Sequence, residues 1–185
     1  MRILVTGGAG FIGSHLCERL LSDGHTVTAI DNLSTGRASN LSTLHGSDSF
    51  ALIEGSILDA SVLNPIIKNV DYIFHLAAAV GVFNIMNNPL ASLLTNIRGT
   101  ENVLEAAHFS NLPVFLTSSS EVYGKNISDS LKESDDRILG SPVTLRWSYS
   151  EAKAIDESLA YAYFVEKKLE TRIVRFFNTV GPRQL

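Results

Sequence analysis

The residues best suited to acid-base chemistry are a tyrosine and a lysine four positions apart, Tyr149 and Lys153. On a helix this spacing places both side chains on one face. A tyrosine with a pKa near its reference value of about 10 is a poor base at neutral pH, but a neighbouring ammonium, together with a positively charged ring bound beside it, favours the phenolate and lowers that pKa. The pair therefore indicates a phenolate base with an electrostatic partner. The same spacing is common in ordinary amphipathic helices, so by itself it more often reflects packing than catalysis.

Polar side chains also gather where a predicted strand at Pro113–Ser118 ends. Ser119 can hydrogen-bond a substrate hydroxyl, and Glu121 offers a carboxyl group for acid-base work. A serine run often marks only a loop, and Glu121 can equally be an exposed loop carboxylate. Because Ser119, Tyr149 and Lys153 follow a glycine-rich turn in this order, we favour the catalytic interpretation.

The glycine-rich turn follows the first predicted strand and reads Thr6-Gly7-Gly8-Ala9-Gly10-Phe11-Ile12-Gly13. The glycines at positions 7, 10 and 13 let the chain turn sharply into a helix and bring backbone N–H groups close to a pyrophosphate. The helix then presents free N–H groups and the positive end of its dipole to that anion. A tight strand–helix connection alone explains three glycines equally well.

The second part of a dinucleotide site is Asp31, which ends the second predicted strand 24 positions after Gly7. A carboxylate there accepts hydrogen bonds from the adenosine ribose and repels a 2′-phosphate. No arginine follows until Arg37, so we predict NAD rather than NADP as the cofactor. The structural alternative is that Asp31 and Asn32 only form a turn.

Short β-branched runs alternate with longer amphipathic stretches along the chain, which predicts an α/β fold with a parallel sheet. The predicted strands are Arg2–Thr6, Thr26–Ile30, Phe50–Glu54, Tyr72–Leu76, Pro113–Ser118 and Thr171–Phe177. The predicted helices are Phe11–Ser22, Ser61–Lys68, Pro89–Phe109 with Asn88 as its cap, and Ser148–Lys168. Gly99 lies inside the third of these helices, where close packing or ligand approach would explain it. We expect Lys125–Ser141 to be a surface loop.

Composition narrows the class of protein. The chain has 185 residues, 45% hydrophobic and 18% charged, with a formal net charge of −4, as expected for one ordinary globular domain. The absence of a basic block argues against nucleic acid or an anionic membrane as a partner. No stretch resembles a signal peptide or a membrane span, so we expect a cytoplasmic protein. Cys17 is expected to be a small buried hydrophobe, and the five scattered histidines suggest no metal site.

With these motifs in place, the chain resembles the extended short-chain dehydrogenase/reductase family over its whole length. His75-Leu76-Ala77-Ala78 and Arg175-Phe176-Phe177-Asn178 match two further strands of that family, and Asn96 and Gly99 match its long central helix. The resemblance implies a Rossmann-type, doubly wound parallel sheet and one NAD-binding domain over residues 1–185. Ser56 stands where the family usually has an aspartate that contacts the adenine amino group.

The resemblance implies a set of cofactor-binding residues along the carboxyl ends of the strands. They are Gly7, Gly10, Phe11, Ile12, Gly13, Asp31, Asn32, Ser34, Thr35, Gly36, Ser56, Ile57, Leu76, Ala77, Ala78, Asn96, Thr117, Tyr149, Lys153 and Phe176. It also implies that Lys153 holds the nicotinamide ribose. Asn178 and Arg183 are the implied substrate-binding residues.

Within the family, Ser119-Ser120-Glu121-Val122-Tyr123-Gly124 and Arg146-Trp147-Ser148-Tyr149 most resemble UDP-glucuronate decarboxylases, with UDP-glucose 4-epimerases next. This resemblance implies transient oxidation of a UDP-sugar at C4, with Ser119, Glu121, Tyr149 and Lys153 as catalytic residues. Related dehydratases carry an Asp-Glu pair where this chain has Ser120 and Glu121, which argues against a dehydratase. The segment Ala78–Val82 departs from the serine- and proline-containing loop of many decarboxylases.

Family members continue well past Leu185 into a substrate-binding lobe, so we expect this chain to be the cofactor half, as a fragment or a truncated product, with that lobe largely absent. A non-catalytic NAD-binding module is the alternative. In similar enzymes the two long helices form a four-helix bundle across a homodimer. Their apolar positions can equally be covered by the sheet alone.

Overall fold

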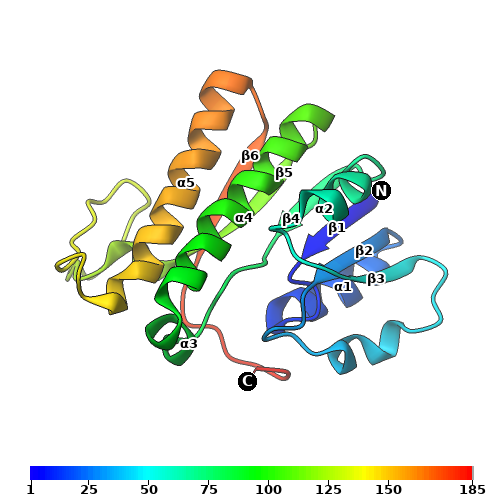
Figure 1. The fold of residues 1–185 in the computed structure, drawn as a ribbon, viewed down its shortest axis with the longest axis horizontal. Coiled ribbons are helices and arrows are strands. Elements are labelled where there is room, and N and C mark those ends of the chain that lie inside the picture. Colours follow the sequence, from blue (N-terminus) through cyan, green and yellow to red (C-terminus); the bar gives the residue numbers. More distant parts are fainter. Residues whose placement is uncertain (185) are drawn as a thin grey trace.

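Six parallel strands form one sheet in the order β3-β2-β1-β4-β5-β6 in the computed structural model, which describes residues 1–184 (Figure 1). The strands are β1 (Arg2–Thr6), β2 (Thr26–Asp31), β3 (Phe50–Glu54), β4 (Tyr72–His75), β5 (Val114–Ser119) and β6 (Thr171–Phe176). The order reverses between β1 and β4, so the carboxyl ends of these two strands border a crevice suited to a ligand. The doubly wound parallel sheet predicted from the sequence is confirmed.

Helices cover both faces of the sheet. They are α1 (Phe11–Ser22), α2 (Ala60–Ile67), α3 (Val82–Asn87), α4 (Pro89–Ser110) and α5 (Ser148–Lys167), with short 3-10 turns η1 (Ala38–Leu44), η2 (Ser120–Tyr123) and η3 (Leu145–Trp147). One core lies under α1 and η1 and contains Cys17 and Val5, and the other lies under α2, α4 and α5 and contains Leu4. The alternation of Leu4 and Val5 between the two cores is the period-2 pattern of a strand buried on both faces.

Local chemistry explains where two of the helices lie. The carboxylate of Asp59 accepts a hydrogen bond from the backbone N–H of Ser61 (2.9 Å, N to Oδ1) and caps the start of α2. In α4, a Cβ atom on Gly99 would overlap the side chain of Ile57. The glycine is therefore needed for close packing of α4 on the segment before α2, one of the two explanations expected from the sequence.

Four short elements were not predicted: η1, α3, η2 and η3 are too short to show a helical period. Where the bounds of predicted elements shift, they shift by one residue; β2 extends to Asp31, and β4 ends at His75 instead of Leu76. Cys17 is buried, and burial raises the pKa of its thiol to about 12, which fits its expected role as a small hydrophobe. Leu185 lies outside the described residues.

Candidate functional site

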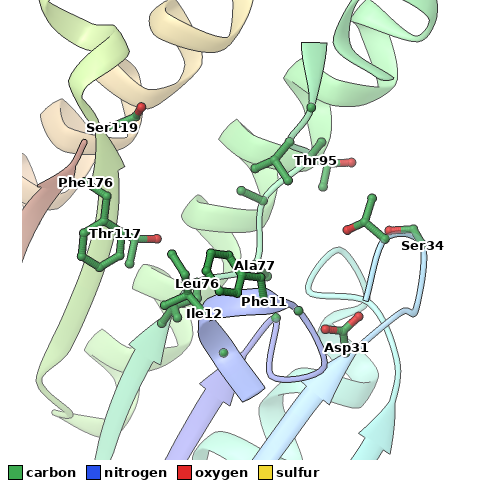
Figure 2. A pocket seen from close by; sticks show the side chains of 18 of the residues that line it. Phe11, Ile12, Asp31, Ser34, Leu76, Ala77, Thr95, Thr117, Ser119 and Phe176 are labelled. Carbon is green, nitrogen blue, oxygen red and sulfur yellow. The ribbon is translucent and has the colours of Figure 1, made fainter. Parts of the chain in front are cut away.

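A cavity of about 980 Å³ lies at the carboxyl ends of the strands, near the upper end of the usual size range for small-molecule sites. Figure 2 shows Asp31 and Ser34 at one end of it and Ser119 and Phe176 at the other, with Phe11, Ile12, Leu76 and Ala77 between them. The structure brings every residue predicted for cofactor binding to the wall of this cavity except Gly36 and Asn96. An elongated cavity with this lining has room for a dinucleotide.

The glycine turn forms the floor of the cavity. Gly7 has a left-handed backbone (φ 70°), and a Cβ atom there would lie 2.8 Å from the backbone nitrogen of Ala77. A Cβ atom on Gly13 would overlap the carbonyl group of Gly7. Side chains at these positions would prevent β1 from turning directly into α1, whose first N–H groups have no partner within the helix and face an anion site. The geometry therefore fits the pyrophosphate of a dinucleotide.

Asp31 holds this end of the cavity together. Its Oδ2 accepts a hydrogen bond from the backbone N–H of Ala9 (2.9 Å), and its Oδ1 accepts one from Leu33 (2.9 Å). A carboxylate has about four lone-pair positions, so it can still accept bonds from two ribose hydroxyls. Gly36 does not line the cavity, but a Cβ atom on it would lie 2.8 Å from the Oδ2 atom of Asp31. Gly36 thus leaves room for the carboxylate.

Asn96 lies behind the cavity wall. Its Oδ1 accepts a hydrogen bond from the backbone N–H of Ala79 (2.6 Å), and its Nδ2 donates one to the carbonyl oxygen of the same residue (3.3 Å). The side chain is almost completely buried. In the chain without ligand, Asn96 fixes the loop after β4 that carries Ala77 and Ala78.

The Tyr149 phenol stands where the cavity meets a second pocket, and its charge state differs from the simple expectation. Burial, which is the largest cause, and the negative charges of Asp156 and Glu121 together raise its pKa to about 12, and a hydrogen bond with Ser119 opposes them. The Lys153 ammonium therefore does not lower this pKa by itself, and the prediction of a lowered pKa also counts on the positive nicotinamide ring of NAD. Activation of Tyr149 as a base needs an additional positive charge.

Lys153 does not supply that charge alone, because it is paired. Its Nζ donates a hydrogen bond to the Oδ2 atom of Asp156 (3.1 Å), and the two side chains are 3% and 0% exposed. Burial raises the pKa of Asp156, and the Lys153 ammonium opposes that shift. Asp156 was not predicted as a site residue: its spacing of three positions from Lys153 is compatible with a pair, but spacing does not show which side of the helix the fold buries.

Glu121 lies outside the large cavity, in an adjoining pocket of about 170 Å³ that also contains Arg146, Tyr149, Val80 and Gly81. The Nη1 atom of Arg146 lies 3.2 Å from the Oε2 atom of Glu121, so carboxylate and guanidinium form an ion pair. The guanidinium also lies over the indole ring of Trp147. The phenol therefore borders a small compartment that holds one acid and one cation.

The two predicted substrate residues have different surroundings. Asn178 and Arg183 both line the large cavity. The Nη2 atom of Arg183 lies 2.7 Å from the Oε1 atom of Glu18 on α1, so in the chain without ligand Arg183 is tied to the pyrophosphate side of the cavity. Sequence position gave no indication of this ion pair, because 165 residues separate its partners.

The described residues 1–184 contain no cluster of three or more His, Cys, Asp or Glu side chains that could hold a metal ion. No helix in this range has both the length and the apolar character required to span a membrane.

Comparison with known proteins then identifies the family. Residues 3–185 match the model of the NAD dependent epimerase/dehydratase family. The chain belongs to this family. NAD is the family's cofactor, as predicted from Asp31 and the glycine turn.

Relatives in this epimerase/dehydratase family include two decarboxylases. The chain is 42% identical over 98% of its length to the UDP-N-acetyl-alpha-D-glucosaminuronate decarboxylase of Bacillus cytotoxicus, of which it covers 56%. It is 40% identical over 98% of its length to UDP-glucuronic acid decarboxylase 1 of Xenopus tropicalis, of which it covers 42%. The chain thus spans about half the length of the relatives it matches.

Solved structures of the same family have the same fold. A dTDP-glucose 4,6-dehydratase from Streptomyces venezuelae with NAD bound matches the whole chain at a TM-score of 0.91 and 34% identity, and the chain covers 58% of it. A UDP-glucose 4-epimerase from Thermotoga maritima matches the whole chain at a TM-score of 0.87 and 32% identity, again over 58% of that structure. The resemblance to decarboxylases and epimerases stated from the sequence is confirmed.

Proposed function

We propose that this protein acts on a UDP-sugar through transient oxidation at C4, and that the reaction is decarboxylation of a UDP-hexuronate. The observation that carries the proposal is the compartment beside Tyr149, where Glu121 and Arg146 lie together. The decarboxylase names of relatives at 42% and 40% identity support it.

NAD would lie along the large cavity, with its pyrophosphate over the glycine turn, its adenosine ribose on Asp31 and its nicotinamide ribose beside Lys153. Bound there, it supplies the acceptor for the hydrogen that leaves the sugar carbon with its electron pair. Ser56 would meet the adenine edge with a hydroxyl in place of a carboxylate.

In the proposed reaction Tyr149 removes the proton from the C4 hydroxyl, and Ser119 hydrogen-bonds the same oxygen. The resulting C4 ketone is β to the C6 carboxylate, so the bond between C5 and C6 can break and leave its electrons in an enolate while carbon dioxide departs. A proton must then reach C5 before C4 is reduced again. Glu121, in the pocket that Tyr149 borders, is the acid we assign to that step.

Arg146 has a specific part in this proposal. Its guanidinium is half-exposed and already pairs with a carboxylate, that of Glu121. A planar guanidinium has five donors and can bind more than one carboxylate oxygen. We assign Arg146 to the C6 carboxylate of the substrate, which would distinguish a hexuronate from a neutral hexose.

Epimerisation at C4 is the second candidate. Structures of several UDP-glucose 4-epimerases match nearly the whole chain, and the segment Ala78–Val82 lacks the serine and proline of many decarboxylases. An epimerase needs no proton at carbon, so it would leave Glu121 and Arg146 without a chemical task. We therefore rank decarboxylation first.

The substrate test compares UDP-glucuronate with UDP-glucose in the presence of NAD, for the 185-residue chain and for any longer polypeptide that carries it. Products are separated by chromatography and identified by mass. The proposal expects a UDP-pentose from UDP-glucuronate. In a polypeptide that is active, Arg146→Met should raise the KM for UDP-glucuronate, while Arg137→Met removes a cation paired with Glu151 away from the pocket and should not. Formation of UDP-galactose from UDP-glucose, with UDP-glucuronate untouched, would favour the epimerase.

We also propose that two copies of the chain associate along α4 and α5, which lie side by side (Figure 1). Large apolar side chains are exposed on these helices, including Phe109 on α4 and Tyr161, Phe164 and Val165 on α5. Exposed apolar surface of this kind favours association. Light scattering of the parent and of Tyr161→Glu/Phe164→Glu tests the proposal, because only the parent should be dimeric.

The cytoplasm remains the predicted compartment.

A further inference from the structure

A chain of buried hydrogen bonds runs from the glycine turn towards the catalytic helix α5. The hydroxyl oxygen of Thr6 accepts from the backbone N–H groups of Leu76 (3.1 Å) and Ala77 (3.0 Å), and it lies 2.8 Å from the Nδ1 atom of His75. With two donors already directed at its oxygen, the Thr6 hydroxyl donates its proton to Nδ1. His75 therefore carries its own proton on Nε2, which lies 3.1 Å from the hydroxyl oxygen of Thr100 on α4.

Asp156 stands at the other end of this chain. Burial raises the pKa of its carboxyl group, and the Lys153 ammonium and the Thr100 hydroxyl oppose that shift. His75 is neutral, because complete burial and the nearby Lys153 charge lower its pKa to about 3. Asp156 thus places a carboxylate between α4 and the lysine in the cavity wall: its Oδ2 accepts the hydrogen bond from Lys153, its Oδ1 has no hydrogen-bond partner among the described residues, and its side chain is 0% exposed.

The charges around Tyr149 are paired on every side. Glu121 on η2 pairs with Arg146 on η3, and Lys153 pairs with Asp156. On the remaining elements that pack here, Glu157 of α5 pairs with Arg175 of β6, and His75 of β4 is neutral. Lys153 and Arg146, which each line a pocket together with Tyr149, are thus each matched by a carboxylate.

We propose that Asp156 is a positioning residue, which fixes the Lys153 ammonium in the cavity wall and keeps the Tyr149 hydroxyl protonated until the positively charged ring of the cofactor is bound. The proposal rests on the assignment of Tyr149 and Lys153 in the proposed function, but it does not depend on which sugar is the substrate.

Two physical arguments support this role. A buried ammonium without a counter-charge is costly, and Asp156 supplies that counter-charge from the same helix, three residues away. Its negative charge also raises the pKa of Tyr149, and so opposes the activation that Lys153 would otherwise give. A bound nicotinamide ring would add a positive charge, whereas the charges of Lys153 and Arg146 are already paired with carboxylates. The added charge would lower the pKa of Tyr149 and favour the phenolate.

The test is Asp156→Asn, which keeps the shape and an acceptor oxygen for Lys153 but removes the charge. Without NAD, the tyrosinate absorbance of the variant is followed as pH rises, to the highest pH at which circular dichroism is still native. Subtracting the absorbance curve of the double variant Asp156→Asn/Tyr149→Phe leaves the ionisation of Tyr149 alone. We expect its transition about one pH unit or more below that of the parent, as loss of a nearby like charge predicts.

The matched control is Glu151→Gln, which removes one negative charge from the same helix at an exposed position where Glu151 pairs with Arg137. It should leave the Tyr149 transition in place. A transition that is unchanged in Asp156→Asn as well would show that Asp156 only stabilises the helix, and would overturn the proposal.

If Asp156→Asn fails to fold, Lys153→Met is compared with Lys153→Met/Asp156→Leu. Removing the carboxylate from a chain that already lacks the lysine should restore thermal stability and move the Tyr149 transition to lower pH. A transition at the same pH in both variants would again overturn the proposal. These titrations use no sugar, so a failed decarboxylase assay would leave their outcome intact.

Discussion

Replacement of Asp31 by alanine tests the adenosine end of the cavity and has a cost that the structure specifies. The substitution removes both acceptors that hold the glycine turn and the following loop, the oxygens bonded by Ala9 and Leu33. The Ala9 N–H is buried and would lose its partner, which costs about 2 kcal/mol, whereas the half-buried Leu33 N–H can turn to water at a cost of about 1 kcal/mol. The free energy of unfolding should fall by about 3 kcal/mol.

For a chain of this size, about 1 kcal/mol corresponds to roughly 2–4 °C in Tm, so Asp31→Ala should melt roughly 6–12 °C below the parent. Calorimetric titration should also show that NAD binding weakens more than NADP binding, because we propose that the Asp31 carboxylate binds the ribose hydroxyls of NAD and repels the 2′-phosphate of NADP. The assay is a melting curve and two titrations on the same preparation.

Asp59→Ala is the control for this prediction. It removes a carboxylate that bonds a backbone N–H at the start of α2, on an exposed surface, so it should lower Tm by less and leave the ratio of NAD to NADP affinity unchanged. An Asp31→Ala chain with the parent's Tm and the parent's preference for NAD would refute both the bracing role and the recognition role of the carboxylate.

Three further predictions concern catalysis, pH and packing. In an active polypeptide Tyr149→Phe should remove nearly all turnover and leave the Kd for NAD largely unchanged, whereas Lys153→Ala should reduce turnover and also weaken NAD binding. Near-normal turnover of Tyr149→Phe would contradict its assignment as the base. Burial lowers the pKa of His75 to about 3 in the folded chain, so between about pH 6.5 and about pH 3 the imidazole is protonated only in the unfolded chain. The free energy of unfolding should therefore decline as pH falls from about 6.5 towards about 3. Chemical denaturation at several pH values should show this decline, and it should be weaker in His75→Asn. Gly99→Ala should lower the free energy of unfolding by about 1–3 kcal/mol, since its methyl group meets Ile57, and an unchanged denaturation midpoint would refute that packing.

Much of the fold could be predicted because its signals are local. A strand buried on both faces, such as β1, appears as an apolar run, and the glycine turn with Asp31 24 residues later marks the first β-α-β unit. The short elements α3 and η1 give no helical period, so nothing in their composition separates them from loops.

The candidate site was predictable as a set of residues but not as a set of charges. Tyr149, Ser119 and Asp31 could be chosen by type and order, and they line one cavity. The pairing of Lys153 with Asp156 could not be predicted, because it depends on which side of the helix the fold buries. Burial of the phenol and the negative charge of Asp156 raise the pKa of Tyr149, so the lysine four residues away does not lower it by itself.

The same limit applies to long-range ion pairs. Arg183 pairs with Glu18 across nearly the whole length of the chain, and Arg146 meets Glu121 only because η2 and η3 converge beside α5. Neither contact has a sequence period or motif. Both follow from the folded topology, which brings the carboxyl ends of separate strands to one edge of the sheet.

Decarboxylation of a UDP-hexuronate by an active polypeptide that carries this chain can be measured with UDP-glucuronate labelled at C6, by following release of labelled carbon dioxide with and without NAD. We expect release that requires NAD, yields an equal amount of UDP-pentose, and is abolished in Tyr149→Phe. Labelled UDP-glucuronate that stays intact, in a preparation that binds NAD and interconverts UDP-glucose and UDP-galactose, would contradict the proposed decarboxylation.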